Sequence, residues 1–185
     1  MNKPSPTDRS ATDRSATDRT DDVRIHGAQP LITPWVLAEE LPLPDAQRHN
    51  IARARREIEA VLRGQDRRLL VIVGPCSVHD PAALLDFAAR LQEGCAPLAD
   101  AILPVLRVYF EKPRTVVGWK GLINDPDLDG SFHINKGLRQ ARKVLLDVAT
   151  LGLPAASEFL DTTFGQYYAD LVSFGAIGAR TVESQ

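Results

Sequence analysis

The chain has 185 residues, of which 25% are charged and 44% are hydrophobic, and its formal net charge is −2. This length and balance predict one soluble domain with a real core and argue against a nucleic acid or a membrane surface as partner. No apolar run is long enough to span a membrane, and the N-terminus lacks the apolar segment of a secretory signal. Two cysteines, Cys76 and Cys95, are typical of cytosolic thiols, so we expect a cytoplasmic protein.

Residues 1–22 are dominated by a five-residue repeat of the type Ser-x-Thr-Asp-Arg, which occurs at 5–9, 10–14 and 15–19. The repeat has no apolar periodicity and alternates the signs of its charges. It cannot bury enough surface to offset its ordering entropy, so we expect residues 1–22 to be disordered. A neutral repeat expansion and a functional arm are both open interpretations.

Residues 23–66 are expected to form an N-terminal extension. The apolar residues between Val23 and Ile32 are spaced like a short extended segment. Thr33 and Pro34 have the pattern of a helix start. A second helix is expected over 45–63, with a stop at Gly64 and one apolar face that comprises Ile51, Ala54, Ile58, Val61 and Leu62. Its opposite, arginine-rich face is either solvated or in contact with a partner subunit.

From residue 67 onward, strands alternate with helices. Strands are expected at 68–73, 104–110, 154–159 and 176–180, and helices follow from Pro81, from about Ile134 and over 164–174. The first strand is apolar throughout, which predicts burial on both of its faces. The helix that begins at Pro81 should have a core-facing side that comprises Leu84, Phe87, Ala88, Leu91 and Cys95. Strands joined by single helical crossovers indicate a parallel α/β sheet.

The pattern favours a (β/α)8 TIM-barrel fold. Neither GxGxxG nor GxxxxGK[ST] follows any strand, so dinucleotide and P-loop chemistry have no support. A complete barrel needs about 250 residues, whereas residues 67–185 hold only four predicted strands. We therefore expect 67–185 to be the first half of such a barrel.

The segment 107–121 is the most distinctive in the chain. It contains four cations interleaved with apolar residues, namely Arg107, Lys112, Arg114 and Lys120. A glycine- and proline-containing loop that carries cations and leaves a buried strand suits a phosphorylated small molecule. An ordinary surface hairpin is the alternative.

Polar residues also stand at the end of every predicted strand, where a barrel gathers its active-site groups. They are Cys76, Arg107 with Lys112, Glu158 and Arg180. Arginine binds phosphate or carboxylate with two hydrogen bonds, so the cations suit two anionic groups. Cys76 is a candidate metal ligand or nucleophile, or simply a small buried side chain. His79, three residues further on, can pair with Cys76 on a metal or be structural in the loop. Glu158 and Arg180 can also form a structural ion pair.

Four motifs give the sequence a family resemblance. GPCSVHD (74–80), RVYFEKPRTVVGWKGLINDP (107–126), GLPAASEFLD (152–161) and GAIGARTVESQ (175–185) resemble the class I 3-deoxy-D-arabino-heptulosonate 7-phosphate (DAHP) synthases. These enzymes are also named phospho-2-dehydro-3-deoxyheptonate aldolases. The resemblance runs from about Val23 to Gln185 and leaves out the repeat. It implies a (β/α)8 barrel that condenses phosphoenolpyruvate with erythrose 4-phosphate in the first step of the shikimate pathway.

The resemblance also implies roles for individual residues. Cys76 falls on a ligand of a divalent metal, which can be Mn²⁺, Fe²⁺, Co²⁺ or Zn²⁺. Arg114 and Thr115 fall on the erythrose 4-phosphate site, and Lys112 is the candidate catalytic residue. The positions that match the phosphoenolpyruvate site are Arg107, Lys112, Glu158, Ala179 and Arg180. Lys120 matches no site position and is interpreted as structural.

The same resemblance implies an aromatic amino-acid effector, with a slight lean to tryptophan, and a homodimer or homotetramer built through N-terminal segments. The remaining metal ligands and two further cations of the family site are expected beyond Gln185, so the 185-residue chain alone is predicted to be inactive. Two alternatives stay open. One is a non-catalytic remnant or a regulatory fragment of the same enzyme, and the other is an aldolase that uses Lys112 as a Schiff base.

Overall fold

The computed structural model describes residues 29–112, 118–160 and 163–178. The chain divides into two compact units, Met1–Pro30 and Leu31–Gln185, and every described helix and strand belongs to the second. The repeat at 5–19, for which disorder is predicted, lies outside the described residues. The start of the expected extended segment, from Val23 to residue 28, lies outside them as well, and residues 29–33 form no strand.

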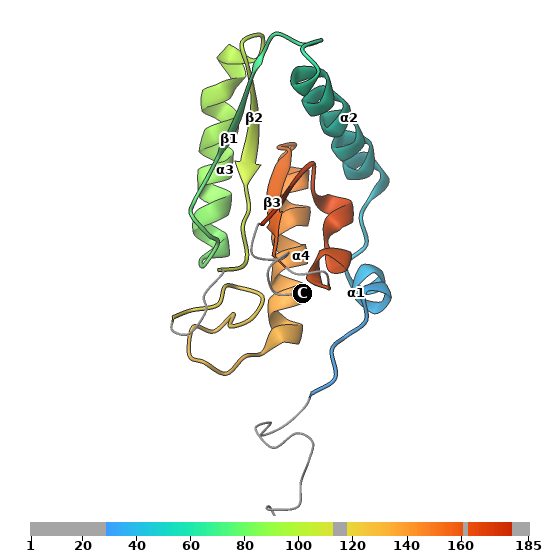
Figure 1. Cartoon of the computed structure of the whole chain (residues 1–185), viewed down its shortest axis with the longest axis vertical. Coiled ribbons are helices and arrows are strands. Elements are labelled where there is room, and N and C mark those ends of the chain that lie inside the picture. The colour runs from blue at the N-terminus through green and yellow to red at the C-terminus, as the bar shows by residue number, and fades with distance from the viewer. Residues whose placement is uncertain (1–28, 113–117, 161–162, 179–185) are drawn as a thin grey trace, which may run out of the picture. The chain divides into compact units, whose positions relative to one another are not determined.

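Four parallel strands form one sheet in the order β1-β2-β3-β4 (Figure 1). Their bounds are β1 (Leu69–Val73), β2 (Ile102–Arg107), β3 (Ala155–Phe159) and β4 (Phe174–Ile177). Spatial neighbours are also neighbours in sequence, so each connection crosses over the sheet before the next strand begins. The predicted parallel α/β sheet is confirmed.

Helices α3 (Pro81–Cys95) and α4 (Ile134–Thr150) cover one face of this sheet. The main core lies between them and the strands, and it includes Leu106, Val108 and Phe110, which alternate along β2 and its extension. The inward residues of α4 recur at helical spacing, and Leu138, Ala141, Leu145 and Val148 are all fully buried. Burial of each such leucine or valine stabilises the fold by about 1.5–3 kcal/mol.

The other face of the sheet packs on helix α2 (Asp45–Leu62). Leu103 and Val105, the intervening residues of β2, form a second cluster with Ala156 of β3 and Ile58 of α2. Because side chains alternate along a strand, the two clusters lie on opposite sides of the sheet. When such a sheet closes into a barrel, one of its faces becomes the interior.

A short helix, α1 (Pro34–Glu40), precedes α2. Thr33 is its N-cap and accepts a hydrogen bond from the backbone N–H of Val36 at 3.3 Å, as the sequence predicts. At its other end, the buried Arg142 of α4 donates to the carbonyl of Leu41 at 2.7 Å and to the carboxylate of Asp170 at 2.7 and 2.9 Å. The arginine thus joins α1 to the segment that leads into β4.

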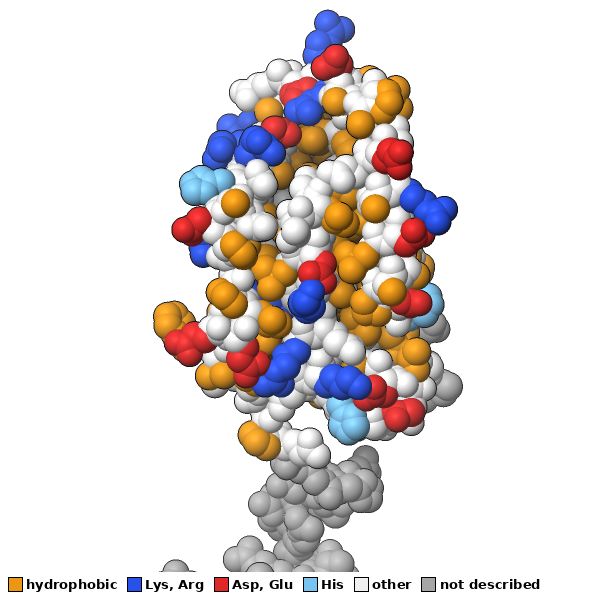
Figure 2. Space-filling model, turned by 180° about the vertical axis from the view of Figure 1, so that it is seen from behind, with side chains coloured by type: hydrophobic (Ala, Val, Ile, Leu, Met, Phe, Trp, Pro, Cys, Tyr) orange, Lys and Arg blue, Asp and Glu red, His pale blue; other side chains and the backbone are white. Residues whose placement is uncertain are grey.

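The burial predicted for β1 and for α3 is partly wrong. Leu69 is 65% exposed, and Ile72 and Phe87 are each 38% exposed. The reason is that β1 lies at an edge of the described sheet, so its side chains are covered on one flank only. On the face opposite to the view of Figure 1, apolar side chains lie in bands between charged ones (Figure 2).

The helix predicted over 164–174 is also wrong. The segment forms two short 3₁₀ turns, η2 (Phe164–Tyr167) and η3 (Ala169–Leu171), and β4 begins at Phe174 rather than at Ala176. Tyr168 separates the two turns with a ψ of 0°, and its ring stacks on Phe159 at 5.8 Å. The burial of this ring against Phe110 and Phe159 outweighs the regular helix that the spacing suggests.

Two sequence expectations concern the chain's environment. Among the described residues, no helix is long and apolar enough to cross a membrane. Cys76 and Cys95 are both thiols rather than partners in a disulfide.

Candidate active site

The predicted site residues on β2 and β3 lie on the same face of the sheet. Arg107 stands two residues after Val105, and Glu158 stands two residues after Ala156. Val105 and Ala156 both belong to the cluster on the α2 side, and strand side chains repeat their direction every second residue. Arg107 and Glu158 therefore occupy the carboxyl ends of neighbouring strands on that same side.

Cys76 lies in the loop after β1 and contacts both predicted cations of the second strand region. The ammonium of Lys112 donates to the Cys76 sulfur at 2.8 Å, and the Arg107 guanidinium donates to the Cys76 carbonyl at 3.2 Å. These hydrogen bonds bridge two adjacent strand ends. The convergence of thiol and cations that the sequence predicts is present for these three residues.

Arg107 is held in a defined orientation. Its guanidinium lies over the ring of Tyr109 at 3.9 Å from the centroid, which is a cation–π contact. Its Nε is buried and has no hydrogen-bond partner among the described residues. A buried donor without an acceptor is costly, and an oxygen of an anionic ligand would satisfy it.

Glu158 lies close to the backbone that follows β4. A Cβ placed on Gly178 would come within 3.2 Å of the Glu158 carboxylate oxygen Oε1 and 2.4 Å of a Leu160 methyl carbon. Only a residue without a side chain fits at that point without displacing its neighbours. The chain after β4 therefore passes directly beside Glu158.

Lys112 is fixed by its backbone as well as by its side chain. Its N–H donates to the carbonyl of Lys120 at 2.9 Å, and Glu111 pairs with Gly121 in an antiparallel bridge. These contacts form a short two-stranded stem at the base of the loop. Arg114 and Thr115, on the predicted sugar-phosphate side, lie outside the described residues, and so do Ala179 and Arg180.

As a candidate metal ligand, Cys76 suits a borderline divalent ion through its thiolate, and it is exposed at the strand ends. Among the described residues there is no group of three His, Cys, Asp or Glu side chains placed to hold a metal. His79 lines a separate cavity of about 340 Å³ with Leu84 and Phe87, and Cys76 does not line it. Among the described residues, Cys76 is thus the soft ligand that lies at the strand ends.

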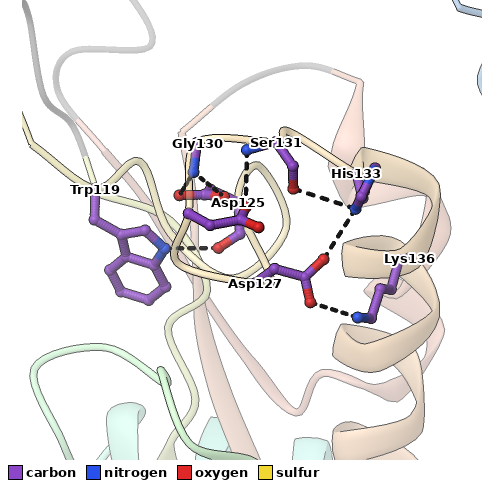
Figure 3. Close-up of polar contacts among 8 residues, drawn as sticks. Trp119, Asp125, Asp127, Gly130, Ser131, His133 and Lys136 are labelled. Carbon is purple, nitrogen blue, oxygen red and sulfur yellow. Dashed lines mark hydrogen bonds and ion pairs between the residues drawn. The ribbon is translucent and has the colours of Figure 1, made fainter.

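Sequence reasoning missed the turn that follows the stem. The indole N–H of Trp119 donates to the Asp125 carbonyl at 2.7 Å, and the Asp125 carboxylate accepts from the N–H of Gly130 at 3.1 Å (Figure 3). Asp127 accepts hydrogen bonds from Lys136 and from His133, and these bonds lower the pKa of its carboxyl. The spacing Asp-x-Asp-x-Asp-Gly at 125–130 is the signal that could have indicated a structured turn.

Comparison with known proteins identifies the relatives of the chain. The model of the DAHP synthetase I family matches residues 45–185. A phospho-2-dehydro-3-deoxyheptonate aldolase of Amycolatopsis methanolica is 57% identical over 165 residues, which are 89% of this chain and 81% of that protein. The Phe-sensitive enzyme of Escherichia coli strain K12 is 56% identical, over 89% of this chain and 47% of its own length.

A solved structure agrees with the sequence comparisons. The phospho-2-dehydro-3-deoxyheptonate aldolase of Francisella tularensis superposes with a TM-score of 0.83 at 52% identity, over 87% of this chain and 47% of that one. The chain thus spans about half the length of these E. coli and F. tularensis relatives. Its four parallel strands match part of a DAHP synthase barrel, as a curled half-barrel. The chain therefore belongs to the class I DAHP synthase family.

Proposed function

We propose that this chain carries the first half of a DAHP synthase active site and contributes to the condensation of phosphoenolpyruvate with erythrose 4-phosphate. The observation that supports this most directly is the contact of Lys112 with Cys76, beside an Arg107 whose buried Nε has no hydrogen-bond partner among the described residues. A thiol ligand and two cations at adjacent strand ends suit a metal-assisted reaction of an anionic substrate.

The proposed binding roles are those that the family resemblance implies for these positions, and the charges of the side chains suit them. Arg107 and Lys112 bind phosphoenolpyruvate, with Arg180, the backbone at Ala179 and the neighbouring Glu158. Arg114 and Thr115 bind erythrose 4-phosphate. In the reaction, the enol carbon of phosphoenolpyruvate attacks the aldehyde carbon of the sugar phosphate. Water then adds to the carbon that bears the phosphate, and phosphate leaves from the resulting hemiketal.

Lys112 is the proposed catalytic residue because its ammonium can neutralise the negative charge that develops on oxygen during the attack. A divalent ion held in part by Cys76 would supply Lewis-acid polarisation of the aldehyde. The position of the Lys112 ammonium against the candidate metal ligand favours this role over that of a Schiff-base amine.

The wider organisation is part of the same proposal. Residues 23–66 form an extension with oligomer contacts ahead of the half-barrel at 67–185, and the full-length enzyme is a cytoplasmic homodimer or homotetramer. Relatives are named for their sensitivity to tryptophan, tyrosine or phenylalanine. We therefore infer an aromatic amino-acid effector here. A non-catalytic remnant or regulatory fragment is the alternative.

A fusion of this chain to the C-terminal half of the E. coli relative tests the proposal. We expect the fusion to consume phosphoenolpyruvate only with erythrose 4-phosphate and Mn²⁺, to release phosphate, and to stop when EDTA is added. The 185-residue chain alone should show no turnover. A folded fusion without activity would favour the remnant. Activity that EDTA leaves intact, with borohydride trapping of substrate on Lys112, would favour the Schiff base.

A further inference from the structure

We infer that Trp119 is a positioning residue: its indole N–H, bonded to the Asp125 carbonyl, holds the stem that sets Lys112 against Cys76. The inference rests on the proposed function for what Lys112 does, and on the geometry of the turn for what Trp119 does. In the described part of the chain, Trp119 makes no hydrogen bond to Cys76, Arg107 or Lys112.

The stem brings two chain segments unusually close together. A Cβ on Gly121 would lie 2.1 Å from the Phe110 carbonyl oxygen and 2.6 Å from the Glu111 Cα. Gly121 also has a φ of +113°, which side chains rarely adopt. The returning segment can therefore pair with Glu111 and Lys112 only because residue 121 is glycine, and Lys120 is thereby placed opposite Lys112.

The turn beyond the stem is anchored in the core. Leu122 and Ile123 are 1% and 0% exposed. A Cβ on Gly137 of α4 would lie 2.1 Å from the Ile123 carbonyl oxygen, so the helix packs directly on the backbone of the turn. The turn is therefore a rigid support for the stem.

Trp119 connects this support to the stem. The carbonyl of Lys120, the next residue, accepts the hydrogen bond from the Lys112 N–H. The indole of Trp119 donates to the carbonyl of Asp125 at 2.7 Å, and Asp125 belongs to the anchored turn. Asp125 also donates its N–H to the Gly121 carbonyl at 2.9 Å and is 6% exposed. Asp125 thus holds both Trp119, just before the returning arm of the stem, and Gly121, within that arm.

The physical consequence concerns preorganisation. A lysine side chain has several freely rotating bonds, so its ammonium is placed accurately only when its backbone is fixed. The indole bond limits the opening of the stem and hence the range of positions that the Lys112 ammonium can reach. Loss of the indole hydrogen bond should weaken the binding of a ligand that Lys112 contacts, although the lysine itself is unchanged.

The first test is amide hydrogen exchange of the 185-residue chain, resolved by NMR. Trp119→Phe keeps an aromatic ring and removes the N–H donor. We expect the Lys112 amide to exchange about 3- to 10-fold faster, which is the range for loss of one hydrogen bond. The Val108 amide, bonded to Ala156 at 2.7 Å within the sheet, should not change.

A matched control is Trp35→Phe, because Trp35 also donates one indole hydrogen bond, to Glu39 at 2.9 Å, but lies on α1 and is 75% exposed. Should Trp119→Phe not fold, the sulfur isostere of tryptophan, benzothienylalanine, can be incorporated in the Trp35→Phe background. That isostere preserves the shape of the ring system and lacks the N–H. Either variant should leave the exchange of α4 amides unaltered.

The second test is the KM for phosphoenolpyruvate of the fusion with the E. coli half. We expect KM to rise about 3- to 10-fold in Trp119→Phe and to stay unchanged in Trp35→Phe. An unchanged Lys112 exchange rate, a uniform increase in exchange across β2 and α4, or an unchanged KM would each overturn the inference. If the wild-type fusion does not bind phosphoenolpyruvate at all, the proposed function fails, and the exchange experiment still decides the role of Trp119.

Discussion

The ammonium nitrogen of Lys112 lies 2.8 Å from the sulfur of Cys76, although 36 residues separate the two in sequence. Each residue follows a strand, and β1 and β2 are adjacent and parallel, with Val73 opposite Leu106. The carboxyl ends of the two strands therefore meet, and their loops share one edge of the sheet. This pairing joins the candidate catalytic cation to the candidate metal ligand.

Replacement of that cation tests its role directly. In the fusion with the E. coli half, Lys112→Met should weaken phosphoenolpyruvate binding by roughly 10- to 100-fold, because a charge-assisted hydrogen bond contributes about 1.5–3 kcal/mol. Isothermal titration calorimetry measures the change. Lys143→Met, on the exposed face of α4 where Lys143 pairs with Asp147, is the control and should bind like wild type. Equal affinities of the two variants for phosphoenolpyruvate would show that Lys112 does not contribute to the binding site.

Arg142 is expected to dominate the stability of the region around α1. Arg142→Leu leaves the Asp170 carboxylate and the carbonyls of Leu41 and Tyr167 without their donor. We expect a loss of about 2–4 kcal/mol in the free energy of unfolding, because Arg142 is 2% exposed and its loss leaves several acceptors without their donor. The measurement is urea denaturation followed by circular dichroism.

Arg139→Leu is the matched control for this prediction. Arg139 is on the same helix and pairs with Glu40, but the two side chains are 43% and 41% exposed. An exposed pair contributes at most about 1 kcal/mol. Similar losses for the two variants would contradict the importance assigned to burial of Arg142.

Two helical glycines should respond in opposite ways to alanine. Gly94→Ala in α3 meets no atom within 4 Å, so helix propensity should stabilise the fold by up to about 1 kcal/mol. Gly137→Ala in α4 places its Cβ 2.1 Å from the Ile123 carbonyl oxygen and should destabilise the fold, by about 1–3 kcal/mol. Thermal melting of the two variants compares them, and a stabilising Gly137→Ala would disprove the close packing of α4 on the turn.

The acid stability of the turn should depend on Asp127. Hydrogen bonds from Lys136 and then from His133 lower the pKa of this carboxyl in the folded protein. A lowered pKa means that the carboxylate stabilises the fold above its unfolded pKa of about 4, and that this stability is lost as pH falls through the folded value. Asp127→Asn should therefore melt earlier at neutral pH and converge with wild type in acid.

Melting temperatures measured from neutral pH down to about pH 2 test this convergence. Asp86→Asn, which removes an exposed carboxylate paired with Arg90 on α3, controls for the loss of one surface charge. If the melting temperatures of Asp127→Asn and wild type differ by the same amount at every pH, the ionisation of the Asp127 carboxyl contributes nothing to stability.

Local features of the fold were predictable because they depend on near neighbours. Thr33 before Pro34 predicts a helix start, and its side chain caps α1 as expected. The apolar spacing of α4 predicts its buried face. The exposure of β1 was not predictable in this way, because it depends on what lies beside the strand in space.

The sequence by itself determined the alternation of strands and helices, the family resemblance of its motifs, and the candidates Cys76, Arg107 and Lys112 at strand ends. Only the tertiary structure decided that Lys112 bonds to Cys76, that Trp119 braces the stem through Asp125, and that two 3₁₀ turns replace a helix before β4. The spacing of apolar residues along a helix or strand indicates which side of that one element is buried. Contacts such as these depend on the packing of elements that are distant in sequence, which no local pattern specifies.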